Sequence, residues 1–132
     1  MTKKYTSGFT VIELIFVAVL AGVVSVIFFA QKNNLESIAS DNIKKTSINA
    51  MYYSLEEVFH SSNNYYPQTI SSDVLKSVDP DLFTDPSGIK LGDEGSSYTY
   101  TPTNCSDNKC KSYTLKAVLE NESDYIKTSK NS

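Results

Sequence analysis

The chain of 132 residues lacks several features by which a function is usually recognised. It contains no arginine, and its formal net charge is −3. Because contacts to phosphate groups depend on Lys and Arg side chains, this charge balance argues against nucleic acid as the main partner. The sequence also shows no nucleophile elbow, no phosphate-binding loop and no paired spacing of His and carboxylate residues. We therefore expect a protein that is not an enzyme.

Cysteine and histidine are scarce as well. The only cysteines are Cys105 and Cys110, and the only histidine is His60. Zinc sites usually take four such ligands, so these residues make a poor zinc site. We predict instead a disulfide between the two cysteines that closes a short loop, as is common in exported domains.

Acidic residues gather between positions 79 and 94, which raises the alternative of a calcium site. The spacing of an EF-hand loop is absent. A solvated loop face is the interpretation that we prefer, and no cofactor is expected. The weak candidates for calcium ligands are Asp79, Asp81, Asp85 and Asp93.

Proline is absent from the first half of the chain, where the first one is Pro67. A helix is therefore not interrupted before that residue. The apolar run from Phe9 to Ala30 contains one ionisable residue, Glu13. At about 1.5 Å per residue, its roughly 22 residues would extend about 33 Å, which is enough to cross a bilayer. We expect residues 9–30 to form a membrane-spanning helix.

The helix is expected to continue as an amphipathic segment over residues 31–62. Apolar residues recur in it largely at steps of three and four positions, and polar residues fill the gaps. This half should pack its apolar stripe against a small domain, and the helix should end near Ser61. The apolar stripe includes Leu35, Ile38, Ile43, Met51 and Leu55, and the gap-filling polar residues include Asp41, Lys44 and Glu56.

Residues 63–132 are expected to form a small α+β headpiece. Segments 97–101 and 111–119 alternate in polarity and are rich in β-formers, which predicts an antiparallel strand pair closed by the disulfide. The predicted fold class is therefore α+β, with a long N-terminal helix packed against a small antiparallel sheet. Three further expectations are a short helix at 73–78, a short edge strand at 89–91 and a loose polar tail after Glu120.

Residues 1–8 form a short polar leader with two lysines and no acids. This positive charge would hold the N-terminus in the cytoplasm and send the C-terminal part across the membrane. The apolar run that follows does not stop at a small-residue cleavage site, so an ordinary signal peptide is disfavoured.

The residues around the start of the apolar run match a known signature. The segment Gly8-Phe9-Thr10-Val11-Ile12-Glu13-Leu14, with a basic leader before it and an apolar run after it, resembles the N-terminus of type IV pilins and type II secretion pseudopilins. The C-terminal half is similar to small bacterial pilin-like proteins. That second match depends on the order of Tyr66-Pro67, Asp85-Pro86-Ser87-Gly88, Tyr98-Thr99-Tyr100 and the block from Cys105 to Leu115.

The resemblance implies a role for three residues. Gly8 would be the last leader residue, cut by a prepilin peptidase, and Phe9 would become the N-methylated first residue. Glu13 would then pair with the Phe9 amine of a neighbouring subunit, because each charge alone is costly in an apolar core. Thr10 and Glu13 also fit a capping box for the first helical turn, and the two roles do not exclude each other.

The same resemblance raises the question of helix flexibility. Many pilins have a proline in the first helix, where this chain has Ala30. Local unwinding would have to centre on Gly22, because Gly weakens a helix by about 1 kcal/mol relative to Ala.

Taken together, the resemblance implies a structural subunit of a type IV pilus-like filament. The precursor would sit in the inner membrane with its headpiece outside, and then join a helical homo-oligomer with the help of an assembly platform and a motor. The filament would be extracellular or periplasmic. The alternatives are a type II secretion pseudopilin and a non-polymerising, signal-anchored surface binding domain.

Overall fold

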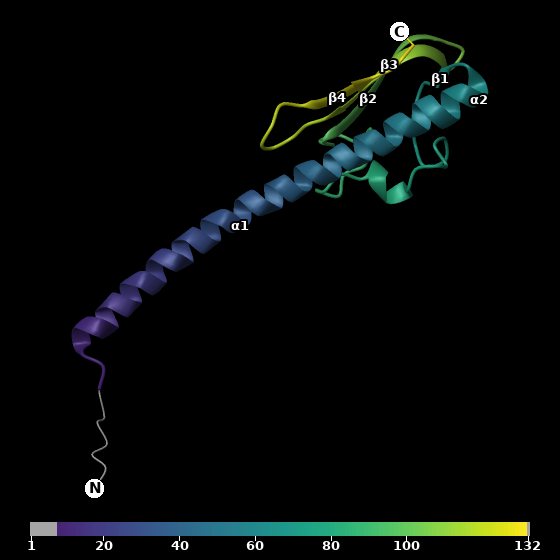
Figure 1. Ribbon diagram of the computed structural model, residues 1–132. Helices are drawn as coiled ribbons and strands as arrows, with labels where there is room; N and C mark the ends of the chain where they lie inside the picture. Colours follow the sequence, from purple (N-terminus) through teal and green to yellow (C-terminus); the bar gives the residue numbers. More distant parts are fainter. Residues whose placement is uncertain (1–7, 132) are drawn as a thin grey trace. The chain divides into compact units, whose positions relative to one another are not determined.

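A computed structural model describes residues 8–131, so most of the expected leader lies outside the described residues. Its dominant element is helix α1 (Val11–Tyr53), which passes without a break into the π-helical segment η1 (Ser54–His60) and the short α2 (Ser61–Asn63) (Figure 1). Asn64 then adopts a left-handed conformation with φ 59°, as is common where a helix ends. The expectation of one long helix ending near Ser61 is confirmed.

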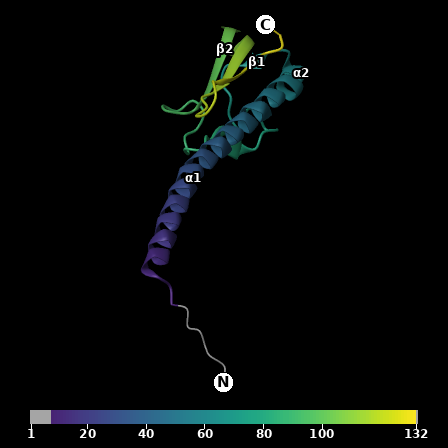
Figure 2. The same cartoon turned by 60° about the vertical axis from the view of Figure 1, so that its left-hand side comes forward.

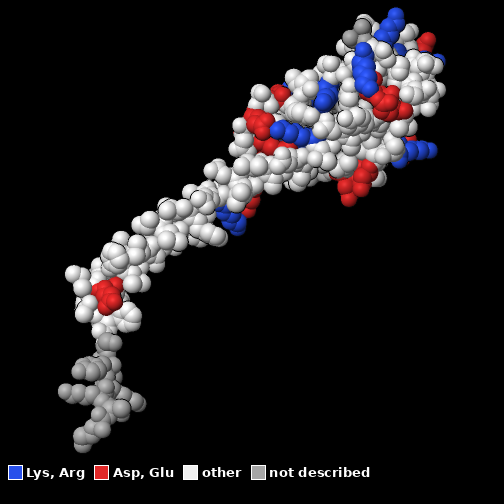
Figure 3. Space-filling view, viewed as in Figure 1, with Lys and Arg blue, Asp and Glu red and all other residues white. Residues whose placement is uncertain are grey.

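The chain divides between Glu36 and Ser37 into two compact units. In the first unit, the large apolar side chains of α1 from Val11 to Phe29 are all between 49% and 78% exposed. This helix is long and apolar enough to cross a membrane. On the face shown in Figure 3, most of its first half is white, without Lys, Arg, Asp or Glu.

The second unit is a headpiece built on a four-stranded antiparallel sheet. The long strand β3 (Lys109–Ala117) is central and pairs with β2 (Tyr98–Ser106) from Tyr98↔Ala117 to Ser106↔Lys109. β1 (Tyr66–Pro67) and β4 (Tyr125–Thr128) also pair with β3, at its start and its end respectively (Figure 1). Figure 2 shows the sheet beside the end of the helix that carries α2. The expected antiparallel strand pair is confirmed by β2 and β3.

The second half of α1 and the segment η1 pack against one face of this sheet. The face of β3 that carries Tyr113, Leu115 and Ala117 is buried. Apolar residues of the helix and of the connection between β1 and β2 are buried as well. The fold is thus α+β, a long N-terminal helix on a small antiparallel sheet. The core contains Ile48, Met51, Leu55, Tyr66, Ile70, Leu75, Val78, Phe83, Tyr98, Cys110, Tyr113, Leu115, Ala117 and Leu119.

The turn between β2 and β3 explains the position of the disulfide. Asp107 and Asn108 both have positive φ, 51° and 63°, as a two-residue hairpin turn with the right twist requires. This turn places Cys105 directly opposite Cys110, with 3.9 Å between the Cα atoms, and the two are joined by a disulfide. The predicted pairing is confirmed.

Three local expectations were wrong. Residues 73–78 form turns, because a helix of six residues gains too few hydrogen bonds to offset its nucleation cost. Residues 89–91 contribute one isolated bridge, Thr84↔Lys90, in place of a strand. The tail after Glu120 is ordered into β4, and the Tyr125 hydroxyl in that strand donates to Asn49 Oδ1 at 2.9 Å.

Candidate functional site

The residues that would be processed lie directly before the long helix. Gly8, Phe9 and Thr10 are non-helical, and the Phe9 side chain is 74% exposed. The Thr10 carbonyl accepts the first two helical hydrogen bonds, from the N–H groups of Glu13 at 3.0 Å and Leu14 at 3.1 Å. The first turn of α1 therefore begins immediately after the candidate cleavage position.

Glu13 is an exposed carboxylate in this first turn. Within residues 8–131, no hydrogen bond or ion pair connects its side chain to another group. Its neighbours along the helix are apolar, so the carboxylate has no cation near it on its own chain from residue 8 onward. The side chain is therefore available to a cation that comes from outside this part of the chain.

Gly22 lies inside α1 with open space around it. No described atom outside the helix backbone lies within 4 Å of the point where a Cβ would stand. The helix is continuous through this residue. A larger side chain could be placed here without a clash in the single chain.

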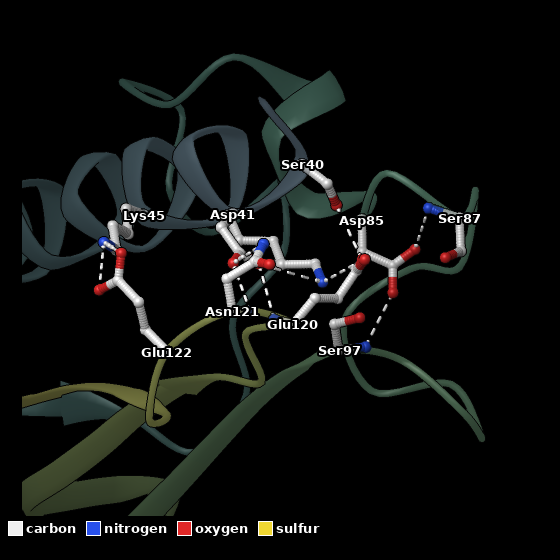
Figure 4. Close-up of polar contacts among 10 residues, drawn as sticks. Ser40, Asp41, Lys45, Asp85, Ser87, Ser97, Glu120, Asn121 and Glu122 are labelled. Carbon is white, nitrogen blue, oxygen red and sulfur yellow. Dashed lines mark hydrogen bonds and ion pairs between the residues drawn. The ribbon is translucent and has the colours of Figure 1, made fainter. Parts of the chain in front are cut away.

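The headpiece holds its last loop to the helix through a buried carboxylate, Asp41. The Asp41 side chain is 3% exposed and accepts hydrogen bonds from the N–H of Glu120 at 2.8 Å and of Asn121 at 2.9 Å (Figure 4). Lys44 is also buried, and its Nζ lies 3.3 Å from Glu120 Oε1 and 3.9 Å from Asp41 Oδ1. The helix thus holds the β3–β4 loop through hydrogen bonds to Asp41 and an ion pair between Lys44 and Glu120.

A second buried carboxylate, Glu56, lies on η1 in the middle of the core. It is 6% exposed and accepts hydrogen bonds from the hydroxyls of Tyr66 at 3.0 Å and Tyr113 at 2.8 Å, and from the N–H of Lys130 at 3.2 Å. Burial, followed by the hydrogen bond to Glu56, raises the pKa of Tyr66 to about 12. The same causes raise the pKa of Tyr113. Glu56 therefore ties the helix to β1, to β3 and to the C-terminal segment.

A third buried carboxylate, Asp85, organises the connection between β1 and β2. It accepts the N–H groups of Ser87 at 2.9 Å and Ser97 at 2.8 Å (Figure 4). The N–H of Ile89 also donates to it, at 3.0 Å. Both of its oxygens are used by the backbone, and Asp79 similarly accepts the N–H of Asp81 at 3.0 Å. Within residues 8–131, no group of three or more His, Cys, Asp or Glu side chains is arranged to hold a metal ion.

The structure corrects the sequence-based assignment of the helix faces. Asp41, Lys44 and Glu56 were taken as gap-filling polar residues, yet they are buried. Leu35, Ile38 and Ile43 were expected in the buried stripe, yet they are 66%, 50% and 51% exposed. Leu35 and Ile38 precede the part of the helix that is covered, and Ile43 lies off the face that carries Asp41, Lys44 and Ile48.

Acid should weaken the headpiece through Asp41 and Asp85. Burial on its own raises the pKa of each carboxyl, but the backbone hydrogen bonds that each accepts outweigh it, and both pKa values fall below 3.8. The stability that the ionised groups add is therefore complete above pH about 4 and is lost as the pH falls below that value. Thermal unfolding of the full chain in uncharged detergent should show this loss. Asp41→Asn should unfold at a lower temperature at pH 7 and depend less on acid. An unchanged acid dependence of Asp41→Asn would contradict this role of Asp41.

Comparisons with known proteins return no relative of this chain. No family model, no curated protein and no solved structure matches it. The class that the structure defines is an α+β headpiece on a helix that is long and apolar enough to cross a membrane. Any finer assignment rests on the chemistry of its own residues.

Proposed function

We propose that this protein is a structural subunit of a type IV pilus-like filament. In this proposal the chain is made as a precursor, cut after Gly8 and N-methylated at Phe9. It waits in the inner membrane with its headpiece outside. It then assembles through its N-terminal helix into an extracellular or periplasmic fibre.

The exposed apolar surface of the first half of α1 supports this proposal. Its large side chains from Val11 to Phe29 are at least 49% exposed on all sides of the helix. A helix that is apolar all round is stable only when lipid or other protein surrounds it. A membrane before assembly and a bundle of equivalent helices after assembly both meet this requirement.

The position of Glu13 is the single observation that favours a filament subunit over a simple membrane anchor. A carboxylate inside a membrane segment costs about 2.5 kcal/mol or more, and a plain anchor gains nothing from it. The free amine that cleavage would create at Phe9 lies four residues away on the same chain. A neighbouring copy shifted along the helix axis could place its own amine beside Glu13. Such a pair offsets the burial of both charges and sets the axial shift between subunits.

Two alternatives use the same features. A type II secretion pseudopilin would share the helix, the cleavage and the pair, and would differ in which assembly machinery it joins. A signal-anchored binding domain would keep its leader and remain a monomer. We prefer the pilus over the pseudopilin because the order of short motifs in the C-terminal half resembles that of small pilins.

The mass of the mature N-terminus tests the proposal. We expect chains from the membrane and from shed fibres to begin at methylated Phe9. Gly8→Leu should leave the leader uncut, because the peptidase would need a small residue at the cleavage point. Gly22→Ala is the matched control and should be cut normally. Mature chains that begin at Met1 would support the anchored binding domain instead.

A further inference from the structure

A groove of about 880 Å³ lies at the end of the headpiece where the long helix stops. We call it the hairpin groove. Its volume is within the range of roughly 300–1,000 Å³ that is usual for ligand sites. The residues used in the argument below are His60, Tyr65, Lys109, Lys111, Ser112 and Lys130.

The groove lies beside the first residues of β3, close to where the helix ends at Asn63. Lys109 and Lys111 are exposed and both line it, whereas Cys110 between them is buried and pairs with Tyr66 of β1. The exposed positions at this end of β3 are thus lysines that face the groove.

The charges of the groove are unequal. Three lysines line it against one acid, Asp107 in the hairpin turn. The Lys130 Nζ forms an ion pair with Glu57 Oε1 at 2.6 Å. Lys109 lies over the Tyr65 ring, 5.2 Å from its centroid, and no carboxylate within residues 8–131 forms an ion pair with Lys109 or Lys111. Two ammonium groups are therefore free to meet an anion from outside the headpiece.

The remaining lining is polar and uncharged. Asn64 and Asn104 bring amides to the groove. Asn131 and Ser112 also line it, where the Asn131 side chain bonds Tyr66 and the Ser112 hydroxyl bonds that of Thr103. Amide and hydroxyl groups both donate and accept hydrogen bonds, which suits the hydroxyls of a sugar. Tyr65 is the one aromatic ring in the lining apart from His60, and Lys109 already covers it.

We propose that the hairpin groove binds an acidic saccharide, with its carboxylate on Lys109 and Lys111. Nucleic acid fits less well, because the groove has no open aromatic platform for bases and the whole chain is net negative at −3. This binding does not depend on filament formation, so it can succeed or fail apart from the proposed function.

The test uses the full chain in uncharged detergent and a fluorescent polygalacturonate oligomer as probe. The methyl ester of the same oligomer has an identical backbone without free carboxylates. We expect binding of the acid, little binding of the ester, and roughly tenfold weaker binding by the double variant Lys109→Gln/Lys111→Gln, since two charge-assisted contacts are lost.

The matched control is Lys76→Gln/Lys90→Gln, which removes the same charge from exposed positions outside the groove. It should bind the acid like the unmodified chain. Equal weakening by both double variants would show unspecific attraction and overturn the proposal. Equal binding of acid and ester, no binding of the acid at millimolar concentration, or tighter binding of a single-stranded oligonucleotide would each overturn it as well. Unfolding temperatures within a few degrees of one another would show that all variants are folded.

Discussion

Replacing Glu13 with alanine is expected to remove filaments while the chain is still cut after Gly8 and still held in the membrane. In the precursor, the change relieves the membrane segment of a carboxylate that costs about 2.5 kcal/mol or more. Membrane retention should therefore be unharmed or improved. In the filament, the Phe9 ammonium of the neighbouring subunit would be left buried without a counter-charge. Breaking a buried pair in this way costs about 3–5 kcal/mol, which weakens each subunit addition roughly 10²- to 10⁴-fold.

The measurement is the amount of this chain in sheared fibres relative to the amount in membranes, together with electron microscopy of the fibres. Glu36→Ala is the control on the same helix. Glu36 pairs only with Lys32 at 3.9 Å, and both side chains are more than 60% exposed, so its loss should leave fibres at normal levels. Normal fibres from Glu13→Ala, or an equal loss from both variants, would contradict the pairing of Glu13 with an amine. Glu13→Gln should behave like alanine, because an amide keeps the shape but not the charge.

Much of the fold follows from local patterns in the sequence. The long helix was predictable because no proline precedes Pro67 and apolar residues recur at helical steps. The β2–β3 hairpin was predictable because its strands alternate in polarity and its two cysteines are close in sequence. In both cases the determining signal lies within a short stretch of chain, which is what single-sequence analysis can detect.

The buried charges of the helix could have been found from spacing. Asp41, Lys44, Ile48, Met51 and Leu55 are separated by three, four, three and four residues, so the two charged residues continue the buried stripe of a helix. Residue type alone suggested that Asp41 and Lys44 face water. Their partners, the backbone of the β3–β4 loop and Glu120, lie about 80 residues away in sequence and give no local sign.

The polar tail was misjudged for a related reason. β4 is held by pairing with β3 and by contacts of its neighbours with the helix, including the Lys130 N–H on Glu56. Hydrophobic periodicity is weak in a four-residue strand that alternates half-buried and exposed positions. The contacts that bring the chain back to the helix after Glu120 involve Asp41, Asn49 and Glu56, which are far away in the sequence.

Replacing Glu56 with alanine is expected to destabilise the headpiece strongly. The variant would leave the hydroxyls of Tyr66 and Tyr113 and the N–H of Lys130 without their shared acceptor. An unsatisfied buried donor costs about 1–3 kcal/mol, so the two buried hydroxyls alone account for about 2–6 kcal/mol, a large part of the stability of a small domain. Urea unfolding of the full chain in detergent, followed by tyrosine fluorescence, should show this loss as a lower midpoint.

Two variants distinguish the hydrogen-bond network from simple packing. Glu56→Gln keeps the size and one acceptor oxygen, and should recover part of the lost stability. Glu57→Ala changes the next residue along η1, whose exposed side chain forms an ion pair with Lys130, and should change the midpoint little. The network also predicts an alkaline limit. Because the folded pKa of Tyr66 is raised from 10.0 to about 12, the stability it supplies is complete below pH 10 and is lost as the pH rises toward 12. Equal midpoints for the Glu56→Ala and Glu57→Ala variants would show that the carboxylate does not hold the headpiece together.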